Sequence, residues 1–162
     1  MDSKYDKMVA SMREKRSDDL FDPSELNTLT EDQRKKVEYE IVFNILYGNS
    51  AFFQYIPHLE TFEAKDIKDK MDYSTLSDTS IIAFDSQIYR VTTNLNDLDK
   101  IIPMANENQL AFCNLAQIYK FNEERDLKKN NEQLLPHLKR CIENECNTNY
   151  ETIFSNEVFK QK

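Results

Sequence analysis

The sequence predicts an all-α protein with six to eight helices. Its 162 residues include one glycine, four prolines and no tryptophan. Tight turns with positive φ favour glycine, and β-sandwiches and barrels need many such turns, so this composition argues against an all-β fold. Apolar residues instead recur every three or four positions behind helix-capping residues, which is typical of amphipathic helices. A chain of this length has enough residues for one sizeable core.

The first expected element is an amphipathic helix over residues 1–16. Four apolar residues recur there at positions i, i+3, i+4 and i+7, namely Tyr5, Met8, Val9 and Met12. Residues 17–29 break this spacing and predict a linker, with one short helical turn after Asp22-Pro23. We therefore expect three regions: the N-terminal amphipathic helix 1–16, the linker 17–29 and a helical domain over 30–162.

A capping box predicts the start of the next helix, over about 31–47. In Thr30-Glu31-Asp32-Gln33, the threonine and glutamine side chains each satisfy a backbone amide that the first turn leaves unpaired. The apolar stripe behind it is Val37, Ile41, Ile45 and Leu46, widened by Tyr39, Val42 and Phe43. Gly48 ends the run where a left-handed residue is expected.

Two further helices are expected in the middle of the chain. One begins near Pro57 and carries Leu59, Phe62, Ile67 and Met71. The other begins after Asp78-Thr79 and carries Ile81, Phe84, Ile88, Val91 and Leu95. Residues 88–93 are rich in β-formers and are compatible with a strand, but the regular three-and-four spacing favours a helix.

Three more helices are expected in the last third of the chain. Asn106 with Gln109 predicts the start of one helix, and the polar run 122–131 predicts a loop after it. A helix over about 132–146 follows, with Leu134, Leu135, Leu138, Cys141 and Ile142 on one side. Thr148 with Glu151 predicts the start of the last helix.

Three segments share a pattern in which two bulky apolar residues precede a proline. They are Tyr55-Ile56-Pro57-His58-Leu59, Ile101-Ile102-Pro103-Met104-Ala105 and Leu134-Leu135-Pro136-His137-Leu138. Proline suits the first turn of a helix, so each segment predicts a helix start. On these segments the chain resembles the HEAT-repeat group of α-solenoids, best over residues 30–72 and more loosely to 146. The resemblance implies stacked helical hairpins with a concave wall that binds other macromolecules. An irregular helical bundle is the alternative.

The charge of the chain favours a basic partner. Its 21 lysines and arginines stand against 29 aspartates and glutamates, which gives a formal net charge of -8. Such a surface repels phosphate backbones and anionic membranes, and it attracts a basic protein. We expect no binding to nucleic acid and none to a membrane. The resemblance agrees with this, because the nucleic-acid-binding members of that group use basic faces that this sequence lacks.

The chain ends and cysteines indicate a cytoplasmic protein. The first residues mix acids with bases and form no apolar core of a secretory signal. The longest apolar stretch, 41–47, is too short to cross a bilayer. Cys113, Cys141 and Cys146 are odd in number and lack the spacing of a disulfide scaffold, so reduced thiols are expected.

No motif in the sequence predicts a catalytic, cofactor or metal site. A lone glycine excludes the glycine-rich phosphate loops and the nucleophile elbow. Neither His58 nor His137 has a carboxylate or a second histidine at i+4, and we expect both at helix starts. Cys113 and Cys141 lie at positions of the apolar stripes, so we expect them to be small residues of the core. Five acidic residues recur every three positions: Glu60, Glu63, Asp66, Asp69 and Asp72. Because an α-helix has 3.6 residues per turn, such acids spiral round it and do not form one wall, which indicates a solvated surface.

The most acidic stretch is the expected partner-binding site. Between residues 72 and 99, five aspartates stand against Arg90 alone, and two tyrosines are available as anchors. Acids around aromatic side chains suit an interface with a basic protein. The predicted partner-binding residues are Asp72, Tyr73, Asp78, Asp85, Tyr89, Asp97 and Asp99.

These observations predict a non-enzymatic binding protein. In size, charge and lack of catalytic motifs it is similar to the small acidic immunity proteins of bacteria. That analogy implies an inhibitor that neutralises a basic protein toxin, such as a nuclease, by covering its active site. A helical protein with an inter-helix pocket for a small ligand or an enzymatic reaction is one alternative. A subunit of a larger assembly is another, and the sequence does not determine the oligomeric state.

Overall fold

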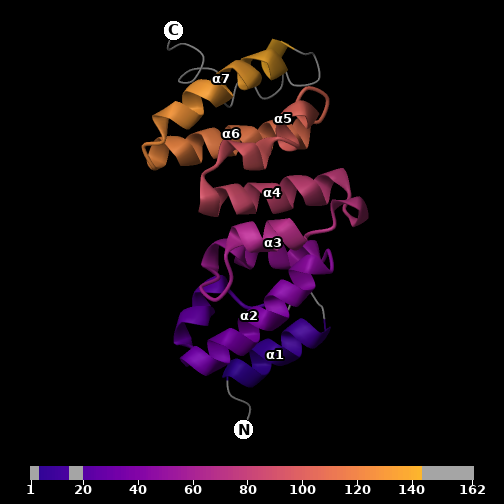
Figure 1. The fold of residues 1–162 in the computed structure, drawn as a ribbon, viewed down its shortest axis with the longest axis vertical. Helices are drawn as coiled ribbons and strands as arrows, with labels where there is room; N and C mark the ends of the chain where they lie inside the picture. Colours follow the sequence, from indigo (N-terminus) through magenta and orange to yellow (C-terminus); the bar gives the residue numbers. More distant parts are fainter. Residues whose placement is uncertain (1–3, 15–19, 144–162) are drawn as a thin grey trace. The chain divides into compact units, whose positions relative to one another are not determined.

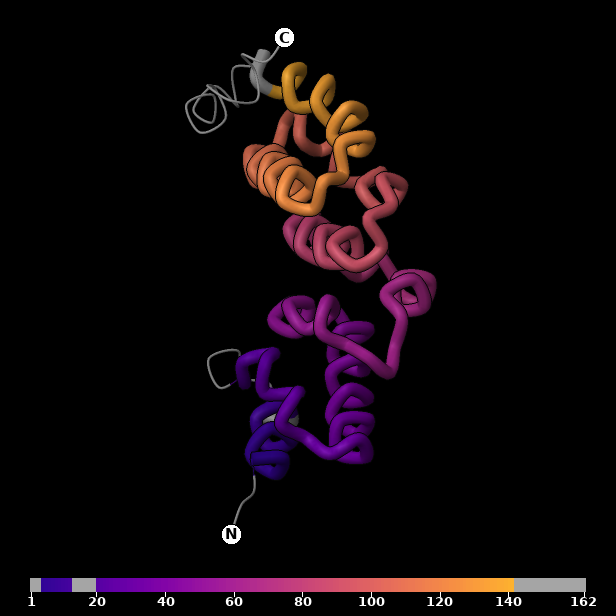
Figure 2. Tube along the Cα trace, turned by 90° about the vertical axis from the view of Figure 1, so that its left-hand side faces the viewer, coloured from indigo at the N-terminus to yellow at the C-terminus, as the bar shows by residue number. Residues whose placement is uncertain are grey.

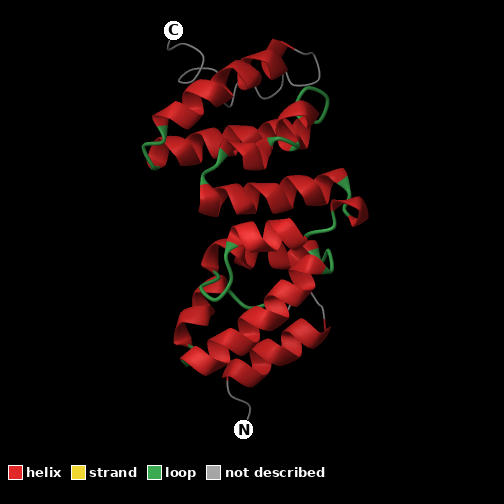
Figure 3. Ribbon diagram, in the orientation of Figure 1, coloured by secondary structure: helices red, strands yellow, loops and turns green. Residues whose placement is uncertain are grey.

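The computed structural model describes residues 4–14 and 20–143, and these residues are all-α. They form seven α-helices and four 3-10 helices, and none of them lies in a strand (Figure 3). The chain divides into two compact units, Met1–Leu76 and Ser77–Lys162. The predicted helical class is therefore confirmed. The predicted last helix, from Thr148, and Cys146 lie outside the described residues.

The first unit is built around the helix α2. Its elements are α1 (Lys4–Glu14), η2 (Pro23–Thr28), α2 (Glu31–Leu46), η3 (Ser50–His58), α3 (Ala64–Lys70) and η4 (Tyr73–Thr75), labelled in part in Figure 1. Met8 and Met12 of α1 are buried in the unit, where α1 packs on α2. Leu26 of η2 is buried as well, and η2 packs on η3. The predicted regions 1–16, 17–29 and 30–162 thus do not coincide with the compact units, because apolar side chains of the first two regions are part of the core of the first unit.

Helix α2 begins as the sequence predicts. The Thr30 hydroxyl accepts a hydrogen bond from the Gln33 backbone N–H at 3.2 Å, and the Gln33 side chain accepts from the Thr30 N–H at 3.1 Å. After the helix, Gly48 has φ of +90°, the left-handed region that favours glycine. Val37, Ile41 and Ile45 face the core.

The helix predicted from Pro57 is wrong. Pro57 lies inside η3, residues 59–63 form no helix, and α3 begins only at Ala64. The Glu38 carboxylate supplies the reason, because its Oε1 accepts hydrogen bonds from the backbone N–H groups of Glu60 and Thr61, both at 2.9 Å. The segment therefore satisfies these amides without forming a helical turn.

The second unit contains the remaining described helices. They are α4 (Asp78–Thr92), η5 (Leu95–Leu98), α5 (Ile101–Met104), α6 (Gln109–Glu124) and α7 (Lys128–Glu143). A short loop, residues 125–127, connects α6 to α7. The two helices therefore form a helical hairpin, and they lie side by side in Figures 1 and 2. The helix predicted over the β-forming residues 88–93 is confirmed as far as Thr92, where α4 ends.

Three details of the second unit differ from the prediction. The N-cap of α6 is Asn108, whose side chain accepts from the N–H groups of Leu110 and Ala111, and not Asn106. The loop predicted over 122–131 is mostly helical, because its polar side chains are hydrogen-bonded to one another, as described below. Pro57 and Pro136 lie inside η3 and α7 and open neither helix, whereas Pro103 lies in the first turn of α5, as its segment predicts.

Candidate functional site

The predicted partner-binding residues are divided between the two units. In the first unit, Asp72 is exposed, and its Oδ1 caps η4 by accepting from the N–H and hydroxyl of Ser74 at 3.1 and 2.6 Å. Tyr73 is half-buried. The other five residues belong to the second unit, where Asp78 and Asp99 are exposed.

Three of the predicted binding residues are buried, which corrects the expectation that they are exposed. Asp85 is 1% exposed, Tyr89 is 0% exposed and Asp97 is 9% exposed. The Asp97 carboxylate accepts a hydrogen bond from the Thr92 hydroxyl. Tyr89 belongs to the core of its unit, because the helical period of α4 turns it inward together with Ile82. Tyr89 is therefore no surface anchor in this structure.

Tyr89 instead belongs to a buried hydrogen-bond network that the sequence analysis did not find. Its hydroxyl donates to Asn122 Oδ1 at 2.7 Å and accepts from Asn130 Nδ2 at 2.9 Å. Asn122 Nδ2 donates to Asn131 Oδ1 at 2.9 Å, and Asn131 Nδ2 donates to the Tyr119 carbonyl at 3.1 Å. Burial raises the pKa of Tyr89, while the two asparagine hydrogen bonds act in the opposite direction. This network joins α4 to the α6–α7 hairpin.

The most conspicuous surface feature is an aromatic stripe on α2 and its C-cap residue, formed by Tyr39, Phe43 and Tyr47. These side chains are 66%, 62% and 73% exposed, and their spacing of four residues places them on one side of the helix. The rings of Phe43 and Tyr47 stack with centroids 6.1 Å apart. Tyr39 packs edge-on against Phe62 at 5.1 Å. The sequence analysis assigned Tyr39 and Phe43 to the apolar stripe of the helix, and that assignment is wrong.

A groove adjoins the aromatic stripe where α1 packs on α2. It has a volume of about 290 Å³ and is lined by Tyr5, Val9, Lys36, Tyr39 and Glu40. Tyr39 belongs both to the groove and to the aromatic stripe. Glu40 is half-buried. Among the residues that the structure describes, neither the Glu40 carboxylate nor the Lys36 ammonium forms an ion pair.

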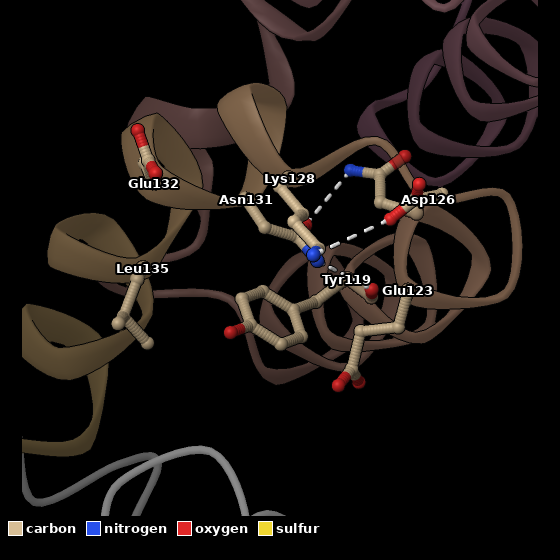
Figure 4. Close-up of a pocket in the computed structure, with 8 residues that line it drawn as sticks. Tyr119, Glu123, Asp126, Lys128, Asn131, Glu132 and Leu135 are labelled. Carbon is tan, nitrogen blue, oxygen red and sulfur yellow. Dashed lines mark hydrogen bonds and ion pairs between the residues drawn. The ribbon is translucent and has the colours of Figure 1, made fainter. Parts of the chain in front are cut away.

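A larger cavity lies between α6 and α7 in the second unit. Its volume is about 370 Å³, and Figure 4 shows its lining: Tyr119, Asn122, Glu123, Asp126, Lys128, Asn131, Glu132 and Leu135. The ammonium of Lys128 lies 3.8 Å from the Asp126 carboxylate. Burial raises the pKa of Tyr119, and the nearby charge of Glu123 raises it further, so this phenol stays protonated at neutral pH. The buried asparagines of the network form part of the wall.

The histidines and cysteines within the described residues are His58, His137, Cys113 and Cys141. His137 lies inside α7, and His58 lies at the end of η3, so the expected helix-start position of each is wrong. Burial lowers the pKa of His137, and the charge of Arg140 lowers it further. Over the described ranges 4–14 and 20–143, no three side chains of His, Cys, Asp or Glu are grouped closely enough to hold a metal ion.

Comparison with known proteins identifies no relative of this chain. No protein-family model matches the chain, and neither a curated protein nor a solved structure matches it. Within the part of the chain that the structure describes, every helix is too short or too polar to span a bilayer.

Proposed function

We propose that this chain is a non-enzymatic binding protein that recognises a basic protein through the aromatic stripe of α2. The observation that carries this proposal is the exposure of Tyr39, Phe43 and Tyr47, each above 60%, on one side of a single helix. Aromatic residues are enriched at protein interfaces, where a few of them supply most of the binding free energy. The three exposed rings of the aromatic stripe can supply such residues at the centre of an interface.

Charge supports a basic partner. The chain carries a net charge of -8, and carboxylates adjoin the aromatic stripe. Glu40 lines the groove beside Tyr39, while Glu60 and Glu63, both exposed, flank Phe62 in the sequence. Acidic groups around an aromatic centre steer a basic protein towards it and then contact its cations at the rim.

Inhibition in the cytoplasm is the role we propose for this binding. A small acidic protein that covers the groove of a basic enzyme blocks access to an anionic substrate, as the immunity proteins do with nuclease toxins. A HEAT-like stacking of helical hairpins is proposed alongside it, supported by the α6–α7 hairpin. The exposed carboxylates Asp72, Asp78 and Asp99, with half-buried Tyr73, are proposed as secondary contacts.

The test begins with capture of partners at low salt and continues with purified proteins. A protein that co-purifies is identified, produced separately and titrated against the wild type and the variant Tyr39→Ala/Phe43→Ala/Tyr47→Ala. A hot-spot aromatic contributes about 2 kcal/mol or more, and a loss of about 3 kcal/mol over the three substitutions corresponds to a loss of affinity of at least ~100-fold. Leu110→Ala is the matched control, because Leu110 is 47% exposed on the other unit. A basic partner that binds the triple variant as tightly as the wild type would contradict the aromatic stripe as the binding surface.

Small-ligand binding is the second candidate function, and the cavity between α6 and α7 is the observation that favours it. Its volume of about 370 Å³ falls within the range of small-molecule pockets, roughly 300–1,000 Å³. A metabolite screen by thermal shift tests it, with Tyr119→Phe and Glu123→Gln as cavity variants. A ligand that stabilises the wild type and both variants equally binds somewhere else.

A further inference from the structure

We infer that the groove between α1 and α2 receives an arginine side chain of the basic partner. This inference rests on the proposed function, since it names the chemical group that the partner presents beside the aromatic stripe. The groove is continuous with the aromatic stripe through Tyr39, which lines both. A partner segment that covers Phe43 and Tyr47 therefore reaches the groove without leaving the surface of α2.

The size and walls of the groove suit one side chain. Its volume of about 290 Å³ lies just below the range of pockets that enclose whole small molecules, roughly 300–1,000 Å³. Tyr5 and Val9 stand one turn apart on α1, and Lys36 and Glu40 stand one turn apart on α2. The walls thus combine two phenol rings, an aliphatic side chain and two charged groups.

The unpaired carboxylate of Glu40 determines the charge of the preferred guest. Glu40 is half-buried, and no cation among the described residues forms an ion pair with it. A guanidinium that enters the groove forms a charge-assisted hydrogen bond with this carboxylate. The faces of Tyr5 and Tyr39 attract the same cation through their quadrupoles.

Arginine fits these walls better than lysine does. Its planar guanidinium stacks on an aromatic ring while its N–H groups still point at a carboxylate, whereas an ammonium is a compact and strongly hydrated point charge. Lys36 opposes either cation from the wall of the groove. Lys36 is exposed, so water screens its charge, and it weakens the site without closing it.

The two charged residues of the groove therefore have opposite effects on binding. Removing the charge of Glu40 weakens the binding of arginine, because the charge-assisted hydrogen bond is lost. Removing the charge of Lys36 strengthens it, because a like charge is removed. A surface that attracts arginine only through the net charge of the protein would not show this pattern, since Glu40→Gln and Lys36→Gln would then change affinity only slightly.

The experiment is a titration of the full-length ¹⁵N-labelled protein with N-acetyl-arginine amide, followed by NMR. N-acetyl-citrulline amide, of nearly the same shape but uncharged, and N-acetyl-lysine amide are the control probes. We expect saturable shifts at the amides of Tyr5, Val9, Tyr39 and Glu40 with the arginine probe. Glu40→Gln is expected to raise its dissociation constant on the order of tenfold, and Lys36→Gln to lower it about twofold. Circular dichroism is used to check that both variants are folded.

Two results would overturn the inference. One is the absence of saturable shifts in the groove, and the other is equal binding of the citrulline or lysine probe. The proposed function is tested separately by the triple aromatic variant and the purified partner. If the partner needs the aromatic stripe but the arginine probe does not bind, only the groove assignment fails. If the probe binds but no partner depends on the aromatic stripe, only the proposed function fails.

Discussion

Glu38, which is fully buried, joins α2 to the segment 59–63 of the first unit. Its Oε2 accepts from Arg34 Nε at 2.9 Å, and its Oε1 accepts from two backbone N–H groups of the segment 59–63. Arg34 extends the connection by donating to the Asn27 side chain at 3.0 Å and to the His58 carbonyl at 2.7 Å. A buried carboxylate costs free energy unless its oxygens are hydrogen-bonded, and here both are.

Replacement of Glu38 is therefore expected to destabilise the first unit strongly. Glu38→Ala leaves the Arg34 guanidinium and two backbone amides without their acceptor, and we expect the free energy of unfolding to fall by about 3–5 kcal/mol. Chemical denaturation measures the change. Glu60→Gln is the control, because Glu60 also pairs with Arg34 but is 70% exposed, so a loss below about 1 kcal/mol is expected. Equal losses in both variants would contradict the structural role of Glu38.

Tyr55 makes the stability of the first unit sensitive to alkaline pH. It is 0% exposed, and its hydroxyl donates to the Phe21 carbonyl at 2.6 Å. Burial raises its pKa, and the charges of Asp22 and Glu25 raise it further. Above pH ~10 an unfolded tyrosine loses its proton while folded Tyr55 keeps it, so the unfolded state gains stability as the pH rises.

The corresponding prediction compares Tyr55→Phe with the wild type between pH 7 and 11. At pH 7 the variant is expected to lose about 1 kcal/mol, the net contribution of one hydrogen bond. Above pH 10 its free energy of unfolding should fall less steeply than that of the wild type. The free energy of unfolding of the variant still falls somewhat above pH 10, because burial also raises the pKa values of Tyr89 and Tyr119. Parallel curves would show that Tyr55 ionises equally in both states.

At the scale of elements, the end of α4 carries unusual backbone strain. Thr93 is its C-cap residue, with φ of +52° and ψ of +25°, a left-handed conformation that a β-branched residue rarely adopts. Asn130 Nδ2 donates to the Thr93 carbonyl at 2.9 Å and so helps to hold it in place. The side chain contributes little in return, since within the described part of the chain its hydroxyl donates only to the adjacent Thr92 carbonyl.

Thr93→Gly is expected to stabilise the second unit. Glycine adopts the left-handed conformation without a Cβ clash, and the backbone carbonyl that Asn130 contacts is retained. We expect a gain of about 1 kcal/mol in the free energy of unfolding. Thr93→Ala is the matched control, because alanine keeps the Cβ and should gain less. Thermal unfolding compares the three proteins, and a less stable glycine variant would contradict the assigned strain.

At the scale of the whole molecule, the net charge should control how quickly a basic partner associates. Electrostatic steering weakens as salt screens the charges, whereas the contacts of a formed interface depend on salt much less. Raising the salt concentration from 50 to 500 mM is expected to lower the association rate constant on the order of tenfold, with little change in dissociation. Stopped-flow mixing of the purified pair measures both. An association rate that is independent of salt would remove steering from the mechanism.

Local chemistry allowed the sequence alone to determine the helical class, the start of α2 and the acidity of the chain. The capping box of α2 involves residues three positions apart, and helical spacing needs no distant partner. The same reasoning failed where a distant residue supplies the hydrogen bonds. The segment 59–63 is not helical because Glu38 binds its amides, and 122–131 is mostly helical because its asparagines bond to one another and to Tyr89.

The candidate site depended still more on tertiary structure. The sequence shows that Tyr39, Phe43 and Tyr47 share one side of α2, but the helix is also apolar on the side of Ile41. Only the packing of its neighbours decides which side is covered and which meets water. For the same reason a sequence-based assignment placed Tyr89 on the surface, whereas the structure buries it. Composition and short-range spacing thus determine helices and charge, while exposure is a property of the packed chain, because it depends on what lies against each side chain.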